Sequence, residues 1–183
     1  MHATALDFVT RALSAEDVEG LRVLEVGSYD VNGSVRPYVE SLRPAEYLGI
    51  DQSEGPRVDR VMDCLDMVDE LGAETFDVVI STEMLEHVRN WQASIEALID
   101  MVCLGALLVI TTRSPGFPYH AYPEDHWRYT VEQMRQIIEG AGLEVLMLEP
   151  DPDPGVFVKA RKPEDWTGFN YDAWSAIEPT KPS

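Results

Sequence analysis

The sequence predicts a three-layer α/β sandwich whose seven-stranded sheet is mostly parallel and contains one antiparallel strand. Short apolar runs alternate along the chain with stretches of helical spacing, which is typical of a parallel sheet with helices on both faces. Seven such apolar runs are present. The last two, residues 143–148 and 155–162, are joined by EPDPDPG, which has no room for a crossover helix, so these strands must be antiparallel.

The predicted strands lie, in chain order, at residues 22–26, 46–50, 58–62, 76–80, 106–112, 143–148 and 155–162. Helical spacing is clearest in WQASIEALIDMV, residues 91–102. A second helix is predicted over residues 130–142, where a threonine can cap the start and two glycines end the segment. We therefore expect one domain over residues 1–162. The aromatic, aperiodic tail over 163–183 either wraps the surface or covers a partner's site.

Composition and charge exclude several classes of protein. The chain has 183 residues, of which 45% are hydrophobic, and a formal net charge of −19. This acidic excess repels polyanions, so no nucleic-acid partner is expected. The longest apolar run, residues 101–110, is shorter than the about 20 residues that cross a bilayer, and the N-terminus does not look like a secretory signal. Since two cysteines also give no disulfide framework, we expect a cytoplasmic protein with no membrane partner.

Small or acidic residues follow the first four predicted strands. Gly27 follows the first, Asp51 the second, Asp63 the third and residues 81–83 the fourth. Ligands of open α/β sheets bind outside the carboxyl ends of the strands, where a carboxylate such as Asp51 can accept both hydroxyls of a ribose. Asp63 could accept a hydrogen bond from an adenine amino group. Each residue alone is more often a turn or cap, but four in order indicate a nucleoside site.

The stretch VLEVGSYDVNG, residues 23–33, distinguishes between cofactors. A pyrophosphate needs several bare backbone amides at a helix N-terminus. Here bulky side chains and the carboxylate of Asp30 separate the two glycines, so a cofactor with adenosine but no phosphate fits better. S-adenosylmethionine is such a cofactor, and the carboxylates of Glu25, Asp30 and Glu83 would favour its cationic sulfonium and ammonium groups.

These segments resemble the motifs of class I, Rossmann-like S-adenosylmethionine-dependent methyltransferases. VLEVGSYDVNG is similar to the family's glycine loop, Asp51 to its ribose acid, Asp63-Cys64 to its adenine-side acid, and FDVVISTEMLEHV to its fourth-strand motif. LGALLVITT is similar to the strand that usually follows LKPGG. The resemblance implies a methyltransferase with S-adenosylmethionine as cofactor. The cofactor-binding residues that it implies are Glu25, Gly27, Ser28, Asn32, Asp51, Gln52, Asp63, Cys64, Thr82 and Met84.

Two departures from the family pattern concern the acceptor side. MVCLGA stands where LKPGG is usual, and only Gly105 of that motif is retained. The large N-terminal cap that is common in small-molecule methyltransferases has no counterpart in residues 1–21. The acceptor side is therefore either open or covered by a second subunit in a homodimer.

The segment RSPGFPYHAYPEDHWRYT, residues 113–130, is predicted to form one wall of the acceptor pocket. It follows the fifth strand at the edge where the cofactor would lie, and long loops without regular structure are usually functional. Its aromatic rings and few polar groups suit a small molecule or a sugar. A subset of the family carries a similar GFPxHxYPxDxWRYT segment, without a firm substrate.

Histidine is the side chain best tuned to remove a proton from an acceptor near neutral pH. His120 is the preferred base, while His87 and His126 are candidates that could instead shape the pocket and brace the loop. Arg128 could bind an acceptor anion, but a pair with a loop carboxylate is preferred. We predict no metal; the alternative to salt-bridged loop residues is a metal site built from His120, Glu124, Asp125 and His126.

The expected function is O-methylation of a small molecule or sugar, with amine or carboxylate acceptors less favoured. One alternative is a non-catalytic module that keeps the fold for binding, against which the intact acids Glu25, Asp51 and Asp63 argue. The other is methylation of a macromolecule. A nucleic-acid base is disfavoured because of the net charge and because STEM stands where such enzymes usually carry NPPY or DPPY.

Overall fold

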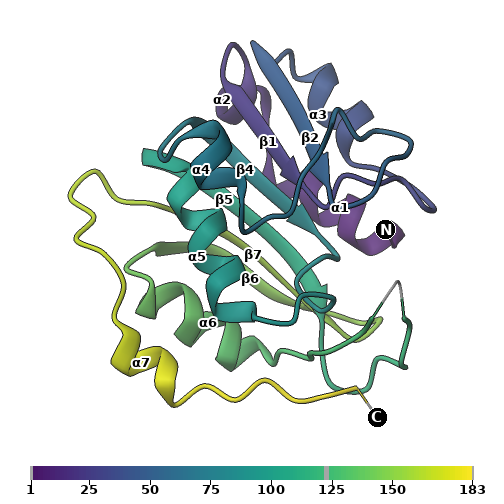
Figure 1. The fold of residues 1–183 in the computed structure, drawn as a ribbon, viewed down its shortest axis with the longest axis vertical. Coiled ribbons are helices and arrows are strands. Elements are labelled where there is room, and N and C mark those ends of the chain that lie inside the picture. The colour runs from purple at the N-terminus through teal and green to yellow at the C-terminus, as the bar shows by residue number, and fades with distance from the viewer. Residues whose placement is uncertain (1, 122–123, 183) are drawn as a thin grey trace.

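The computed structural model describes residues 2–121 and 124–182. Its sheet has the strand order β3-β2-β1-β4-β5-β7-β6 (Figure 1). β7 runs antiparallel to both of its neighbours and the other pairings are parallel, so the predicted sheet with one antiparallel strand is confirmed. The strands are β1 (Arg22–Val26), β2 (Glu46–Asp51), β3 (Arg60–Val61), β4 (Phe76–Thr82), β5 (Val102–Arg113), β6 (Glu144–Asp151) and β7 (Gly155–Arg161).

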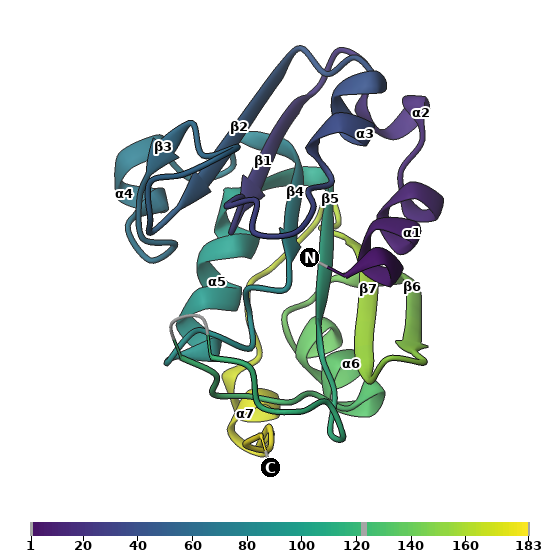
Figure 2. The same cartoon turned by 90° about the vertical axis from the view of Figure 1, so that its right-hand side faces the viewer.

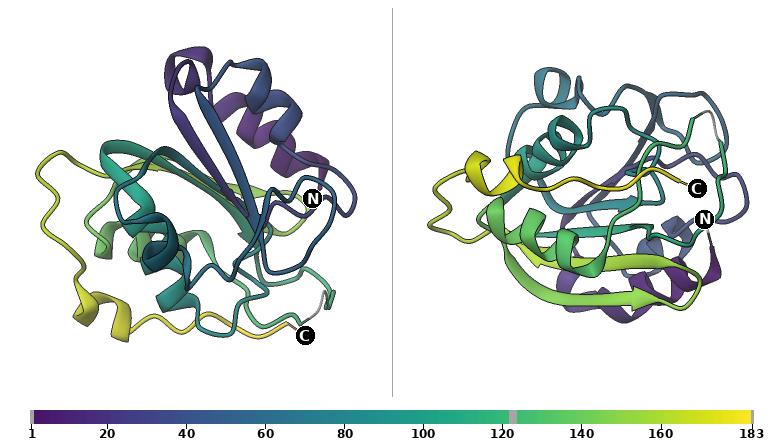
Figure 3. Two further views of the ribbon diagram at one scale, coloured as in Figure 1. Left: turned by 45° about the horizontal axis from the view of Figure 1, so that its top comes forward. Right: turned by 90° about the horizontal axis from the view of Figure 1, so that it is seen from below.

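Helices cover both faces of the sheet and make three layers (Figures 2 and 3). Side chains on alternate residues of a strand point to opposite faces. In β4, Val78 and Ile80 therefore pack in the apolar cluster of the first three helices, whereas Val79 packs in the cluster of the later helices. The helices are α1 (Ala3–Ala12), α2 (Ala15–Val18), α3 (Arg36–Ser41), α4 (Met67–Leu71), α5 (Trp91–Met101), α6 (Val131–Gly140) and α7 (Tyr171–Ser175).

Both predicted helices are present, with small shifts at their ends. α6 begins at the predicted threonine: Gln133 N donates to Thr130 Oγ1 at 3.1 Å, and Thr130 N donates to Gln133 Oε1 at 2.9 Å. This reciprocal capping box gives hydrogen-bond acceptors to two backbone N–H groups at the start of the helix. α5 ends at Met101, and β5 begins at the next residue, four residues earlier than the predicted strand. β3 keeps only two of its five predicted residues, because it is an edge strand that pairs with β2 alone.

The C-terminal tail packs against α5 and α6 on one side of the sheet (Figure 1). Trp174 is 1% exposed, and its ring lies 5.7 Å from that of Trp91 on α5. Its Nε1 donates to Ile137 O of α6 at 2.9 Å. Trp166 donates in the same way to Ala141 O at 2.7 Å. Within the described part of the chain, no helix combines the length and the apolar character needed to cross a membrane.

Candidate active site

The carboxyl ends of the first parallel strands meet at one edge of the sheet, and two adjoining cavities lie there. The Glu25 cavity, of about 280 Å³, contains side chains that follow β1 and β4 together with His120 of the loop after β5. The Asp63 cavity, of about 360 Å³, lies toward β3 and the start of α5. Four residues line both cavities: Asp51, Gln52, Met84 and His87. The two cavities are therefore halves of one continuous cleft.

All ten residues expected to bind the cofactor line this cleft. Three of them are shared by both halves: Asp51, Gln52 and Met84. The Glu25 cavity also contains Glu25, Gly27, Ser28, Asn32 and Thr82. The Asp63 cavity contains Asp63 and Cys64. The fold thus brings together side chains from four strand ends, as the strand-end pattern predicted; their individual roles stay predictions.

The turn after β1 requires a glycine. Gly27 has φ +83°, and a Cβ there would lie 2.8 Å from Met84 Cβ, closer than two carbons can approach. Its backbone N and that of Ser28 both donate to Ile50 O, at 2.9 and 3.0 Å, which fastens the turn to the end of β2. Ser28 Oγ is buried and has no hydrogen-bond partner among the described residues, so a polar group is available at this wall of the cavity.

Asp51 lies between the two halves of the cleft with its carboxylate fixed by the backbone. Its Oδ1 accepts from Ser53 N at 2.9 Å, and its Oδ2 accepts from Tyr29 N at 3.3 Å. A carboxylate has about four lone-pair positions, so both oxygens can accept further bonds from a ligand. At the other end of the cleft, Asp63 Oδ1 accepts from Leu65 N at 2.9 Å.

Glu25 is a buried carboxyl group at the back of its cavity. The residue is 2% exposed, and burial raises the pKa of the carboxyl to about 7, although a hydrogen bond from Tyr47 OH at 2.7 Å acts in the opposite direction. The Arg36 guanidinium lies 4.8 Å from the Tyr47 ring rather than on the carboxylate itself. A cationic ligand group in the cavity would stabilise the ionised form of Glu25.

Two other carboxylates that were expected to attract the cofactor's charges are already engaged. Glu83 forms an ion pair with Arg113 of β5, and it accepts from both the backbone and the ring of His2 at 2.8 and 2.7 Å. Asp30 Oδ1 accepts from Gly33 N at 2.7 Å. His2 also lines the Glu25 cavity, and no sequence signal singled it out.

The structure places two of the three candidate histidines in the cleft. The rings of His87 and His120 lie 4.9 Å apart with their planes at 69°. Burial lowers the pKa of both, and the neighbouring ring lowers that of His120 further, so both imidazoles are neutral at pH 7. His87 lies in a turn, since α5 begins only at Trp91.

His126 lies outside both cavities. Its Nε2 is 3.2 Å from Glu124 Oε2, and its backbone N donates to Glu86 O at 2.8 Å, which fits the expected alternative role of bracing the loop. Glu124 is also paired with Arg89, at 2.8 Å. Three residues of the alternative metal set, Glu124, Asp125 and His126, are thus engaged in pairs within the loop or with Arg89, as salt-bridged loop residues would be.

The loop over residues 113–130 is held by a buried bidentate pair. Arg128 Nη1 donates to Asp125 Oδ1 at 2.5 Å and Nη2 donates to Oδ2 at 2.6 Å, and Arg128 is 1% exposed. The expected pairing of Arg128 with a loop carboxylate is therefore present. From this loop, His120 and Ala121 line the Glu25 cavity. Two members of the predicted acceptor wall, Tyr122 and Pro123, lie outside the described residues.

A mostly parallel sheet in this strand order, with an acid-lined cleft at its carboxyl edge, defines a Rossmann-like class of nucleoside-cofactor proteins. The family described as "Methyltransferase domain" matches residues 1–149. The chain belongs to this methyltransferase family, and the prediction of a class I S-adenosylmethionine-dependent methyltransferase is confirmed. No curated protein matches the sequence significantly.

Solved structures with the same fold have low sequence identity to this chain. A 1,6-didemethyltoxoflavin-N1-methyltransferase from Burkholderia thailandensis, with bound 1,6-didemethyltoxoflavin and S-adenosylhomocysteine, is 15% identical with a TM-score of 0.71, over 87% of this chain and 78% of that one. An S-adenosylmethionine-dependent methyltransferase from Mesorhizobium loti is 18% identical with a TM-score of 0.64, over 87% and 98%. Magnesium protoporphyrin IX methyltransferase from Synechocystis PCC 6803, with bound SAM, is 17% identical with a TM-score of 0.64, over 86% and 77%.

Proposed function

We propose that the protein methylates an oxygen of a small molecule or sugar, with the acceptor bound in the Glu25 cavity beside His87 and His120. The observation that carries this proposal is the arrangement of the cleft. Asp51 after β2 and His87 lie at the junction of its halves, Asp63 after β3 lies in one half, and His120 lies beside His87 in the other. A solved structure of similar fold, which contains 1,6-didemethyltoxoflavin together with S-adenosylhomocysteine, supports a small-molecule acceptor.

The residues of the cleft fit S-adenosylmethionine. Asp51 would accept the ribose hydroxyls, Asp63 would accept from the adenine amino group, and Glu25 would balance the cationic end of the ligand. The glycine at position 27 leaves space that a side chain would fill. When bound, the cofactor supplies an electrophilic methyl group on a positively charged sulfur.

The chain's own residues then have two tasks. The first is to hold the acceptor oxygen at near-contact distance and in line with the methyl group. The second is to take the proton that the hydroxyl loses. His120 is the proposed base, because its neutral ring lies half-buried in the cavity and can accept a proton near pH 7.

Methyl transfer from labelled S-adenosylmethionine to a panel of sugars, hydroxylated metabolites and amines tests this function. We expect a hydroxyl compound to become labelled and His120→Ala to lower turnover by about 10²–10⁴-fold, the usual range for loss of a general base. His126→Ala is the matched control, since this histidine lies on the same loop but outside the cleft. Cofactor binding without transfer to any acceptor would instead indicate the non-catalytic module.

A further inference from the structure

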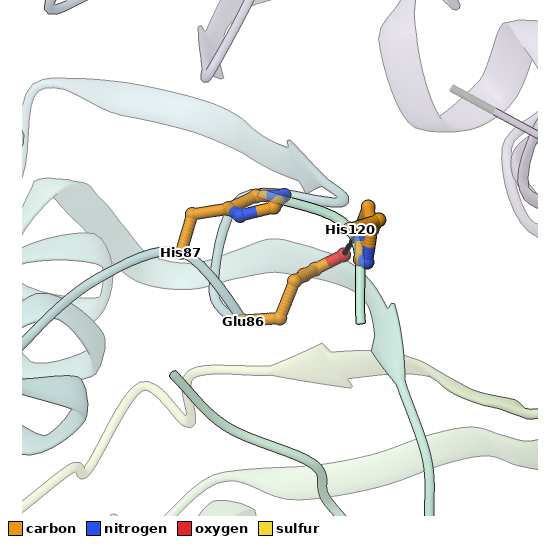
Figure 4. A group of neighbouring side chains, drawn as sticks. All are labelled: Glu86, His87 and His120. Atoms are coloured by element: carbon orange, nitrogen blue, oxygen red, sulfur yellow. Dashed lines mark ion pairs between the residues drawn. The ribbon is translucent and has the colours of Figure 1, made fainter. Parts of the chain in front are cut away.

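We propose that Glu86, His87 and His120 form a site for one divalent transition-metal ion at the wall of the Glu25 cavity. The side chains come from the turn after β4 and from the loop after β5, and their ligand atoms all lie within 4.8 Å of one another. Figure 4 shows the Glu86 carboxylate directed toward His120, with the His87 ring above it. A tetrahedral ion would hold such atoms about 3.3 Å apart, which small side-chain rotations can provide.

Glu86 is the strongest evidence for a ligand at this place. It is fully buried, at 0% exposure, and its Oε2 accepts from Thr112 Oγ1 at 2.8 Å. Its Oε1 is buried without a hydrogen-bond partner among the described residues and lies 3.8 Å from His120 Nε2. A buried carboxylate oxygen without a partner carries a large desolvation penalty, which a bound cation would remove.

His87 is oriented by an acceptor on the outer side of its ring. His87 Nδ1 is 2.6 Å from Glu124 O, and a carbonyl can only accept, so Nδ1 carries the proton and the lone pair is on Nε2. His120 is held through its backbone, since its N donates to Asp125 Oδ2 at 2.8 Å. Its Nδ1 lies 3.2 Å from the same oxygen without forming a hydrogen bond, and its Nε2 is the nitrogen near Glu86. Metal-bound histidines commonly donate their second N–H to a carbonyl or carboxylate, as His87 does to Glu124 O.

The donor set selects the kind of ion. Two imidazole nitrogens and one carboxylate oxygen suit Zn²⁺ and similar first-row ions, whereas Mg²⁺ and Ca²⁺ prefer oxygen ligands alone. The cluster differs from the metal alternative considered from the sequence, because it shares only His120 with that set.

Three protein ligands leave a coordination position open toward the cavity, as in catalytic zinc sites. This part of the inference rests on the proposed function. An acceptor hydroxyl bound there would lose its proton to solvent more easily, its oxygen would form the bond to the methyl carbon, and the carbon–sulfur bond would break with the electron pair left on sulfur. With the ion bound, His120 acts as a ligand, and the metal takes over the role of activating the hydroxyl.

The test measures metal binding by the untagged, chelator-treated chain without any cofactor. We expect calorimetry with Zn²⁺ to give one saturable site per chain, Co²⁺ to give visible bands of low-coordinate geometry, and Zn²⁺ to raise the melting temperature. His87→Ala, His120→Ala and Glu86→Gln should each weaken Zn²⁺ binding at least tenfold. His126→Ala, a histidine outside the cleft, should leave the Zn²⁺ affinity unchanged.

Circular dichroism of each variant separates loss of the site from loss of the fold. No saturable Zn²⁺ or Co²⁺ binding by the folded wild type overturns the inference, and it leaves His120 as the general base. Binding that the three ligand variants do not weaken, or that His126→Ala abolishes, also overturns it. Failure of the proposed function would have a different signature, since S-adenosylmethionine would then produce no binding heat while Zn²⁺ still bound.

Discussion

Glu25 should make the binding of S-adenosylmethionine depend on pH. The pKa of this buried carboxyl is about 7 in the free protein, against an ordinary value of 4.5, and a cationic ligand group beside it would lower the pKa in the complex. At pH 5.5 a group with this pKa is only about 3% ionised, and at pH 7.5 about 75%. If only the ionised form attracts the ligand, the affinity rises roughly 25-fold across this interval, about 1.9 kcal/mol.

Calorimetry between pH 5.5 and 7.5 measures this effect directly. The affinity is expected to increase with pH and to level off above pH 7, because Glu25 ionises over this range. Since a cationic ligand favours the ionised carboxylate, protons are released on binding. Glu25→Gln keeps the shape of the side chain and should bind with an affinity that is flat over this range and no higher than that of the wild type at pH 5.5. The same slope in Glu25→Gln would refute the assignment.

Three further perturbations follow from the same geometry. Asp51→Ala should weaken S-adenosylmethionine binding by about 1.5–3 kcal/mol, roughly 10- to 150-fold by calorimetry, and unchanged affinity would remove its ribose role. Gly27→Ala should lower the free energy of unfolding in a urea titration by more than Gly20→Ala, because both have positive φ but only the first Cβ would strike a neighbouring methionine; equal losses would show that the clash is relieved. Arg128→Ala should cost about 3–5 kcal/mol in the same assay by leaving the buried Asp125 carboxylate without its guanidinium partner, and a loss below about 1 kcal/mol would contradict the importance of the pair.

The first four strands were predictable because each is a short apolar run that is followed by a small or acidic residue. The 22–26 run gives β1 with the predicted bounds, and the EPDPDPG link identifies the reversed strand. α1 was missed although its signal is present: Ala5, Phe8, Val9 and Ala12 recur at helical intervals and are buried against the sheet. α3, α4 and α7 have only five or six residues each, too few for a periodic pattern, and such short helices depend on tertiary packing.

The cofactor side of the site follows from topology, since parallel strands bring their carboxyl ends to one edge and place Asp51 beside Gly27. The acceptor side depends on the paths of two irregular segments. His87 and His120 are 33 positions apart, and nothing in their spacing shows that their rings meet. Glu86 stands next to His87 in the sequence, yet its complete burial depends on the turn that points it toward β5. Such contacts are fixed by the folded loop and not by a local pattern.

A crystal structure of the chain with S-adenosylhomocysteine bound tests the central claim most directly. We predict that the ribose hydroxyls lie within hydrogen-bonding distance of Asp51, that the adenine lies in the Asp63 cavity, and that the sulfur faces the His87–His120 side of the Glu25 cavity. A ligand bound away from this cleft, or a sulfur that faces away from both histidines, would contradict the account.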